Sequence, residues 1–559
     1  MRLSRGDLLF VSVVSALAGL AFAIVASSCA PRRQAAEEGV LQVSETEQTE
    51  SFIRNFNPLL EVGDVRWAAK NSMYEPMLIH NPIKGVYVPW LAESYRWEDT
   101  KLIFALRHEV LWSDGQPFRA RDVVFTFELL KKFDALDTRG VWRFLAGVRA
   151  VDDFTVEVSF RRSYVPGLFF IGQQPIVPEH IWKDVADPVS FTNENPVATG
   201  PFTEVAWFRT QAYQVNRNPH YWQKGKPAVQ SLRFIALPGN DQSVLAMING
   251  ELDWAGDFVP AIDRVYVAKD PEHYHYWFPL IDGMVMLYTN TSEPPYDDER
   301  VRKAISMAID RELVVEVAMH GYSKPADGTG LNEGYEKYRS PEAVARGASW
   351  VKYDLGAASA LLDTVGLKKG ADGWRRKPDG SVWEVNVNCP AGWTDWVRAA
   401  QAIARGLQKA GIHATLRAYD YNTWFDKVQN GDFDLTVGWT EPGPTPYGLY
   451  RNLMSTETKK PKGQASAENW HRYGSLEADV LLARLEQTLD PAEEMRLTYE
   501  LEMLFATHAP AIPLFPGPLW GQYDSNRFEG FPDKDNPYAP LSPHNSPQPL
   551  LVLPELRPR

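Results

Sequence analysis

The stretch LRHEVLWSDGQPFRARDVVFTFELL, residues 106–130, joins a strand end, a tight turn and a helix within one short segment. Apolar residues alternate at strand spacing in the residues that lead into it, at Leu102, Phe104 and Leu106. Asp114-Gly115 is typical of a turn, because glycine tolerates positive φ and aspartate can hydrogen-bond its own backbone. Helical spacing follows Pro117, at Val123, Phe127 and Leu130. The segment predicts a scaffold unit of a mixed α/β protein and contains nothing catalytic.

The composition predicts a globular protein with several folded units. The chain has 559 residues, of which 44% are hydrophobic, and a domain usually takes about 150 residues. The net charge of -13 argues against nucleic acid as a partner, because phosphate binding needs concentrated Lys and Arg. The aromatic content is high, with 19 Trp, 23 Tyr and 26 Phe, so some tryptophans are candidates for ligand contact.

Residues 1–29 have the order of an export signal. Arg2 and Arg5 precede an apolar run from Leu8 to Val25, and small residues lead to Cys29. This order resembles a bacterial lipoprotein signal, in which Cys29 would be lipidated and become the new N-terminus, although Ala26 stands where Leu is usual. Plain export and an uncleaved anchor are the alternatives. Residues 30–40 are then a short tether to the membrane.

The two cysteines predict no disulfide framework. If Cys29 carries lipid, Cys389 has no partner in the chain. Strand and helix signals alternate from residue 41 to residue 553, which indicates an α/β fold. Residues 297–322 read as one long helical stretch with acids at its start, as the helix dipole prefers.

A few residue pairs could suggest catalysis. His273 and His275 could ligate a metal from one strand face, but no third His or Cys is near in sequence. Two carboxylate pairs, Asp297-Asp298 and Asp432 with Asp434, would suit an exported glycoside hydrolase, yet their neighbours are typical of helix starts and turns. The chain contains neither a GxSxG elbow nor a GxxxxGK[ST] loop. We therefore expect no catalytic residue, metal or cofactor, and no ATPase activity in this chain itself.

Several motifs occur in an order that resembles one family. WSDGQPF is followed by DVVFTFE, then by ATGPF with NPHYW, and then by PPYDDERVRKAISMAIDRE. Over residues 50–530 the chain resembles the extracytoplasmic solute-binding proteins of the oligopeptide and dipeptide ABC importer family. One departure is Arg119, where a capping Thr or Ser is common, so a weaker helix cap is expected there.

The resemblance implies an α/β, two-lobed periplasmic-binding-protein (Venus flytrap) fold with an extra subdomain on lobe one. By analogy, lobe one takes residues 41–85, 198–285 and 505–559, the subdomain takes 86–197, and lobe two takes 286–504. Residues 281–291 would form one strand that crosses between the lobes. The opening hairpin belongs to the subdomain and serves as scaffold.

The resemblance also implies a function. The protein would be a monomer in the periplasm or at the cell surface that captures a ligand by hinge closure and delivers it to ABC permease subunits and, through them, to ATPase subunits. Peptide binders of the family hold the ligand's ammonium with an Asp shortly after a strand that ends in Gly-Trp-Thr or similar. Here that position falls at Pro442 or Gly443, and Glu441 is the only acid near it. GPLWGQY and the following FEGFPDKDNPYAP, within residues 517–540, resemble the relatives in this family that bind β-linked oligosaccharides. Oligosaccharide is therefore the favoured ligand, and oligopeptide, with Glu441 in place of the Asp, is the alternative.

Tryptophans in segments expected to border the cleft agree with a sugar ligand. A pyranose presents an apolar C–H face that can lie on an indole, while its hydroxyls need amides and carboxylates at the ring edge. The candidate ligand-binding residues are Trp439, Glu441, Trp393, Trp396 and Trp520, with Tyr523, Trp254 and Trp67 as further candidates. For any single tryptophan, packing within its own lobe is the competing explanation. Trp97, Trp112 and Trp424 are expected in the core.

Overall fold

The structure is a computed structural model that describes residues 38–45, 49–60 and 65–559. Residues 41–559 form one compact unit, to which the description below refers. The expected signal, Cys29 and tether residues 30–37 lie outside the described residues. In the ranges that the structure describes, no helix is long and apolar enough to cross a membrane.

The first large sheet has seven strands, in the order β12-β18-β11-β1-β10-β9-β8. Its strands come from both ends of the chain and from the segment before the expected crossing strand. They are β1 (Val40–Val43), β8 (Phe202–Arg209), β9 (Ala212–Arg217), β10 (Ser231–Ile235), β11 (Trp254–Ala255), β12 (Tyr274–Tyr276) and β18 (Gln522–Asp524). The adjoining helices are α5 (Asn240–Ile248), α6 (Ile262–Val265) and α16 (Pro549–Val552), with 3-10 turn η4 (Val267–Lys269). Near the chain end, β19 (Phe528–Glu529) pairs with β20 (Arg557–Pro558).

The second large sheet has five strands, in the order β15-β14-β16-β13-β17. They are β13 (Met284–Thr289), β14 (Glu384–Pro390), β15 (His413–Tyr419), β16 (Leu435–Trp439) and β17 (Ile512–Pro516). Strand β14 runs parallel to β15 and β16, whereas β13 is antiparallel to β16 and β17. Every residue of β13 is buried, as expected for a central strand covered on both faces. Strand β17 joins this sheet, although residues 505–559 were expected in lobe one.

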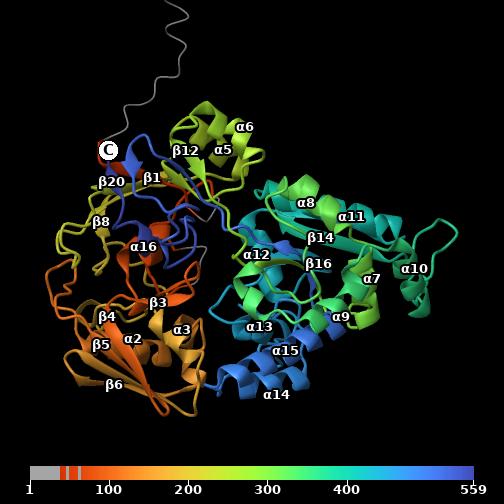
Figure 1. Cartoon of the computed structure of the whole chain (residues 1–559), viewed down its shortest axis with the longest axis horizontal. Helices are drawn as coiled ribbons and strands as arrows, with labels where there is room; N and C mark the ends of the chain where they lie inside the picture. Colours follow the sequence, from red (N-terminus) through yellow and green to blue (C-terminus); the bar gives the residue numbers. More distant parts are fainter. Residues whose placement is uncertain (1–37, 46–48, 61–64) are drawn as a thin grey trace, which may run out of the picture. The chain divides into compact units, whose positions relative to one another are not determined.

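Helices surround the five-stranded sheet, with α8 and α11 packed side by side (Figure 1). They are α7 (Glu299–Met307), α8 (Arg311–Met319), α9 (Pro341–Val351), α10 (Leu355–Thr364), α11 (Thr394–Lys409), α12 (Tyr421–Asn430), α13 (Tyr447–Met454), α14 (Leu476–Leu485) and α15 (Pro491–His508), with 3-10 helix η5 (Glu333–Tyr338). The stretch 297–322, predicted as one long helix, is two helices. Asp310 ends the continuity because its side chain accepts the Leu313 N–H at 3.2 Å and caps α8.

A four-stranded antiparallel sheet, in the order β4-β5-β7-β6, contains the strand that leads into the turn at Asp114-Gly115, which is closed by an isolated bridge between Leu111 and Pro117. Its elements are β4 (Ala92–Glu98), β5 (Lys101–Leu106), β6 (Leu145–Asp152), β7 (Thr155–Phe160), α2 (Ala120–Lys132), α3 (Gly167–Gly172) and α4 (Glu179–Trp182), with η2 (Asp134–Leu136) and η3 (Val141–Arg143). The π-helix η1 (Ala69–Met73) and the hairpin β2 (Leu78–Asn81) with β3 (Val86–Pro89) precede it. The predicted turn is confirmed: Gly115 has φ +84 and donates its N–H to the Trp112 carbonyl at 2.8 Å.

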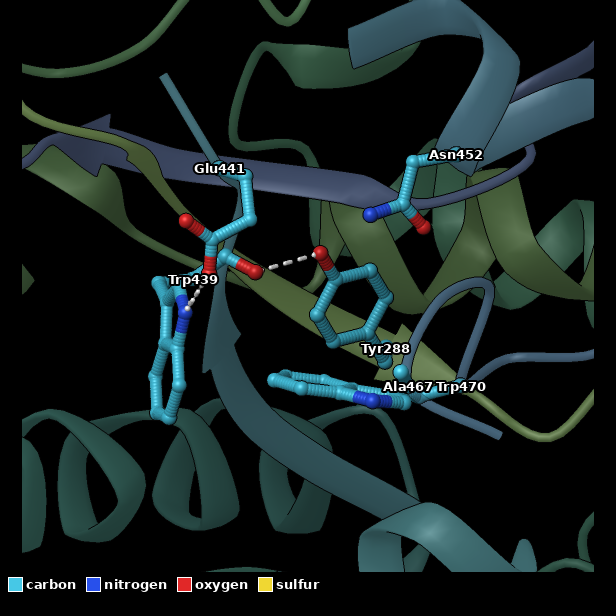
Figure 2. Close-up of a pocket in the computed structure, with 6 residues that line it drawn as sticks. All are labelled: Tyr288, Trp439, Glu441, Asn452, Ala467 and Trp470. Carbon is cyan, nitrogen blue, oxygen red and sulfur yellow. Dashed lines mark hydrogen bonds between the residues drawn. The ribbon is translucent and has the colours of Figure 1, made fainter. Parts of the chain in front are cut away.

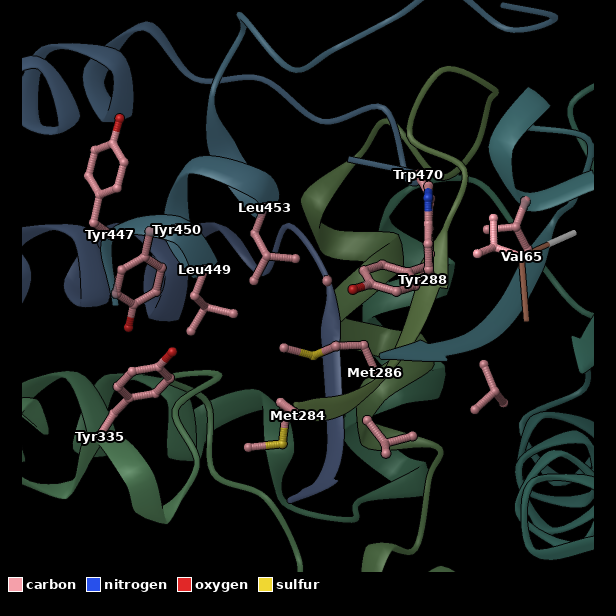
Figure 3. Close-up of a cluster of buried hydrophobic side chains, with 14 of the residues drawn as sticks. Val65, Met284, Met286, Tyr288, Tyr335, Tyr447, Leu449, Tyr450, Leu453 and Trp470 are labelled. Atoms are coloured by element: carbon pink, nitrogen blue, oxygen red, sulfur yellow. The ribbon is translucent and has the colours of Figure 1, made fainter. Parts of the chain in front are cut away.

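The interior of the five-stranded part is rich in methionine and aromatic side chains. Met284 and Met286 of β13 lie between Tyr335, Tyr450 and Leu453 on one side and Tyr288 with Trp470 on the other (Figure 3). These side chains are almost completely buried. Removing them from water supplies much of the stability of this part, at roughly 25 cal/mol per Å² of apolar surface.

The cap of α2 comes from Asp122 rather than from Arg119. Asp122 is 1% exposed, and one of its oxygens accepts the Arg119 N–H at 2.8 Å. The other accepts the Glu179 N–H at 3.1 Å, so one carboxylate fixes the start of both α2 and α4. The weak cap expected at Arg119 is thus compensated three residues later, as in the acidic half of a capping box.

Replacing Asp122 with Ala should lower the free energy of unfolding by about 1–3 kcal/mol, because two partly buried N–H groups lose their acceptor. Urea unfolding followed by circular dichroism measures the change. Asp153→Ala is the matched control, because the Asp153 side chain is 80% exposed in the same subdomain. Equal effects of the two substitutions would contradict a capping role for Asp122.

Candidate ligand-binding site

Three chain segments come together where the five-stranded sheet begins. Thr440 donates its N–H to the Met284 carbonyl at 3.0 Å, and its hydroxyl accepts the Met284 N–H at 2.9 Å. Gly517 donates its N–H to the Gly283 carbonyl at 2.8 Å. A Cβ on Gly283 would lie 1.8 Å from the Thr440 carbonyl oxygen, so only glycine permits this approach. The ends of β13, β16 and β17 are thereby held in one place.

Beside these segments lies a cluster of indole rings. Trp439 ends β16, Trp393 and Trp396 begin α11, Trp424 lies in α12, and Trp470 lies in the loop before α14. The Trp393 and Trp396 ring centroids are 4.8 Å apart, and those of Trp439 and Trp470 are 5.1 Å apart at an interplanar angle of 89°. Trp424 is fully buried beneath the others, as expected. The cluster forms one continuous aromatic wall.

A small recess opens at this wall; its empty space of about 230 Å³ includes open solvent, and the enclosed part has room for little more than one water molecule. Its lining residues are Tyr288, Trp439, Glu441, Asn452, Ala467 and Trp470 (Figure 2). The Trp439 indole N–H donates to Glu441 Oε1 at 2.8 Å, and the Tyr288 hydroxyl donates to the Trp439 carbonyl at 2.8 Å. These bonds hold the Trp439 ring and backbone in one orientation. Aromatic faces, one carboxylate and one amide therefore meet in a small space.

Electrostatic repulsion marks the same region. Burial first, and then the nearby Glu441 carboxylate, raise the pKa of Asp282 from 3.8 to about 6. Asn545 donates its side-chain N–H to Asp282 Oδ1 at 3.3 Å. The pKa values of Tyr288 and Tyr335 are also raised, mainly by burial and further by Glu441. Asp282 and the exposed Glu441 thus lie near each other, beside the three segments that meet at Gly283, Thr440 and Gly517.

A second, larger recess lies at the opposite end of the five-stranded sheet, where β14 and β16 begin. It encloses about 900 Å³ of empty space, much of it open solvent, and its lining is strongly polar. Lys427 and Lys462 in its wall are paired with Asp432 and Glu293 at 2.6 and 3.0 Å. This recess lies at the other end of the strands from Gly283, Thr440 and Gly517, where the chain is expected to cross between the lobes. We therefore place the candidate site at the aromatic wall, which lies beside those residues.

The structure brings four of the eight residues expected to contact ligand into one cluster: Trp439, Glu441, Trp393 and Trp396. Of these, Trp439 and Glu441 line the recess, whereas Trp396 is only 6% exposed. Trp520 lies apart from them and packs against Phe258 and Phe278, at centroid distances of 5.5 and 4.8 Å. Tyr523 is 8% exposed and stacks on Phe531 at 4.5 Å.

The positions of Trp67 and Trp254 speak against a role in ligand contact. Trp67 is 5% exposed and Trp254 is completely buried. Their indole N–H groups donate to the Pro543 and Leu541 carbonyls at 2.8 and 2.6 Å, so their one polar atom is already used. Of the tryptophans expected in the core, Trp112 is fully buried, whereas Trp97 is only partly buried against Phe160.

The sequence interpretation missed Tyr288, Asn452, Ala467 and Trp470. Tyr288 lies in the predicted crossing strand, and its proximity to the site could have been expected from that position. Asp282 precedes the same strand and was also missed. The segment around Trp470, ENWHRYGS, has no periodic pattern, so no local signal connects it with β16.

The residues weighed for catalysis have local structural partners. His273 Nδ1 is 2.9 Å from Asp270, and His275 Nε2 is 3.1 Å from the Glu272 carbonyl. Asp298 caps α7 by accepting the Arg300 N–H, and Asp434 accepts the Asn386 N–H at 3.0 Å. Within the described ranges, no group of three or more His, Cys, Asp or Glu residues could hold a metal ion.

Two α/β sheets joined by crossing segments, with an antiparallel subdomain, define a two-lobed periplasmic-binding-protein fold. A mannohexaose-bound periplasmic oligopeptide-binding protein of an ABC transporter from Thermotoga maritima has this fold, with a TM-score of 0.86 and 27% identity over 94% of this chain and 99% of that one. The chain belongs to the bacterial extracellular solute-binding proteins, family 5, whose model matches residues 86–461. It is thus the substrate-binding component of an ABC importer, and the family is extracytoplasmic.

Relatives of this chain differ in what they bind. Protein XP55 of Streptomyces lividans is 27% identical over 466 residues, which cover 79% of each chain. The glutathione-binding protein GsiB of Salmonella choleraesuis is 25% identical over 454 residues, covering 78% of this chain and 82% of its own. The oligopeptide-binding protein AppA of Bacillus subtilis, solved with a nonapeptide, has a TM-score of 0.78 at 20% identity, over 94% of this chain and 99% of its own, and shows the shared fold.

Replacing Asp282 with Asn should make stability depend less on pH. The folded-state pKa is raised, so the stabilising contribution of the protonated form is complete below about pH 4 and is lost as the pH rises through about 6. Asp282→Asn should therefore exceed the wild type in free energy of unfolding at pH 7.5, by on the order of 1–2 kcal/mol, and show no advantage at pH 4.

Denaturant unfolding at both pH values measures this difference. Asp297→Asn is the control, since Asp297 is exposed at the surface. An advantage of Asp282→Asn that is the same at pH 4 and pH 7.5 would refute a raised pKa at Asp282.

Proposed function

We propose that this protein binds an oligosaccharide at the Trp439 recess and delivers it to an ABC permease. The observation that carries this proposal is the 2.8 Å hydrogen bond from the Trp439 indole to Glu441. It fixes the indole plane and engages the one acid that stands near the ammonium-binding position of the family's peptide binders. The site therefore favours a ligand with apolar ring faces over a ligand that brings a free ammonium.

The chemistry of the recess suits a pyranose. The apolar C–H face of a sugar ring can lie on Trp439 or on the neighbouring indole of Trp393, while ring hydroxyls can reach the Asn452 amide and the Glu441 carboxylate. The mannohexaose bound by the Thermotoga maritima protein supports the same ligand class at 27% identity.

An oligopeptide is the alternative ligand. Its support comes from relatives such as the glutathione-binding protein, and from the carboxylates of Asp282 and Glu441, which could stabilise a buried ammonium. Under this alternative the Glu441 charge, rather than the Trp439 ring, would dominate the affinity. Affinity for an oligosaccharide would thus depend mainly on Trp439, and affinity for an oligopeptide mainly on Glu441.

The proposed mechanism is hinge closure without chemical change of the ligand. The seven-stranded sheet would form the core of lobe one, the five-stranded sheet that of lobe two, and Gly283, Thr440 and Gly517 the hinge between them. Ligand bound between the lobes stabilises the closed form, which the permease then recognises. We propose that the protein acts as a monomer and is non-catalytic. A hydrolase with an acid pair would instead turn over an oligosaccharide.

Mannohexaose should raise the melting temperature of the mature protein, and Trp439→Ala should abolish the shift. At 100 times its Kd, a ligand that binds only the folded state adds about 2.7 kcal/mol to the free energy of unfolding. Trp439→Phe should keep part of the shift, because a smaller aromatic face remains. Thermal unfolding with a series of hexoses and of di- to pentapeptides measures these effects.

Two controls separate the ligand classes. Trp207→Ala removes an indole from β8 of the other sheet and should leave the shift unchanged. Glu441→Gln should matter most if the ligand is a peptide whose ammonium is held there. A shift with peptides alone, lost in Glu441→Gln, would replace the oligosaccharide proposal with the oligopeptide one.

Lipid attachment at Cys29 is a separate proposal that rests on the signal-like residues 1–29. Cells that express the protein should incorporate labelled palmitate into it, and Cys29→Ser should abolish incorporation and release the protein from the membrane fraction. Cys389→Ser is the control, because that thiol is buried in the fold. Membrane retention of Cys29→Ser without label would indicate an uncleaved anchor instead.

A further inference from the structure

The four-stranded subdomain and the helices of the five-stranded part touch at a site remote from the crossing segments. The segment 161–166 follows β7 and leads into α3, and it meets α13 and the C-terminal end of α14. Val165 donates its backbone N–H to the Glu486 carbonyl at 2.8 Å. The two partners are 321 residues apart in the chain, so the contact joins separately folded parts.

Glu486 is the central residue of this contact. Its side chain is 9% exposed, and the Arg162 guanidinium donates to its Oε1 while the Tyr447 hydroxyl donates to its Oε2 at 3.0 Å. Burial raises the Glu486 pKa, and the Arg162 charge opposes this effect. Arg162 remains 57% exposed, so it screens the carboxylate from the solvent side. A buried carboxylate of this kind depends on donors from both parts of the molecule.

Two tyrosines extend the contact. The Tyr164 and Tyr447 hydroxyl oxygens are 3.4 Å apart, their ring centroids are 6.2 Å apart, and the residues are 5% and 4% exposed. Figure 3 shows the Tyr447 hydroxyl pointing away from the Met284 and Met286 cluster. Tyr447 therefore presents its polar end to the subdomain and its ring to its own part.

A second bridge joins the two large sheets by another route. Asn240, at the start of α5, donates its backbone N–H to the Gly392 carbonyl at 3.1 Å and its side-chain N–H to Asp395 Oδ1 at 3.2 Å. Asp395 is 4% exposed at the start of α11. The structure thus has the two lobes bridged at two places in addition to the hinge, which is the arrangement of a closed form.

We propose that residues 161–166, together with Glu486 and Tyr447, form a latch that holds the lobes closed. The inference rests on the proposed hinge closure, because rotation at Gly283, Thr440 and Gly517 would separate the two sides of the contact. On opening, Glu486 loses the Arg162 and Val165 donors and returns to water. None of the latch residues lines the aromatic recess, so the latch sets the open–closed balance independently of ligand chemistry.

Removing one side of the latch should shift the ligand-free protein toward the open form. Arg162→Ala removes the charged donor from an exposed position, so the fold should remain intact. The ratio of closed to open protein should fall about 3- to 10-fold, the size expected for a typical hydrogen bond, because the exposure of Arg162 to solvent weakens its charge interaction. Small-angle X-ray scattering of the ligand-free full chain measures this ratio, by fitting each profile with closed and opened coordinates.

Arg149→Ala is the matched control, because Arg149 is 60% exposed and pairs at 2.7 Å with Glu157 within the same four-stranded sheet. Its scattering profile should match that of the wild type. Tyr164→Phe provides a second test of the latch, since it removes only one hydroxyl and keeps the ring. Circular dichroism melting confirms that each variant is folded.

An unchanged closed fraction in both Arg162→Ala and Tyr164→Phe would overturn the latch, and so would a wild-type protein with no closed fraction in the absence of ligand. Equal opening in Arg149→Ala would do the same. Titration with mannohexaose distinguishes the latch proposal from the oligosaccharide proposal. If mannohexaose does not bind, only the oligosaccharide proposal is contradicted. If the sugar does bind, its affinity should weaken in Arg162→Ala by the factor by which the closed fraction falls.

Discussion

The close approach of Gly283 to the Thr440 carbonyl is the constraint on which the candidate site depends. No side chain can be accommodated there, since even a Cβ would overlap the carbonyl oxygen at 1.8 Å. The approach fixes the register between the ends of β13 and β16, and Trp439 is the last residue of β16. The Trp439 ring, which lines the recess, is therefore positioned by the backbone contact at the next residue, Thr440.

Several neighbouring side chains fix the position of the Trp439 ring. Glu441 orients the Trp439 indole, and Tyr288, one strand away, holds the Trp439 carbonyl. Trp393 and Trp396 support the ring from α11, while Trp424 fills the space beneath. Asp282 adds a carboxyl group whose pKa is raised by burial and, further, by the Glu441 charge. A small shift of the backbone at Gly283 or Thr440 would thus displace the rings of the aromatic wall.

Local sequence patterns predicted the elements better than the site. The turn at Asp114-Gly115 and the α/β class follow from spacing and residue type, and the motif order pointed to the family. The break at Asp310 was missed because the helical pattern continues across it, although Asp is a good capping residue. For the tryptophans, type alone does not distinguish Trp254, whose N–H is satisfied by Leu541, from Trp439 at the recess. Only the tertiary partners decide which ring is core, and those partners lie hundreds of residues away.

The right angle between the Trp439 and Trp470 rings limits the shape of any extended ligand. Successive units of a straight, ribbon-like chain present parallel faces, so they can stack on one of these indoles but not on both. A chain that stacks on both must turn between one unit and the next. For the oligosaccharide proposed above, the geometry of these two side chains would select among linkages: flexible or helical glycans could follow the corner, and flat, rigid ones would be confined to a single ring.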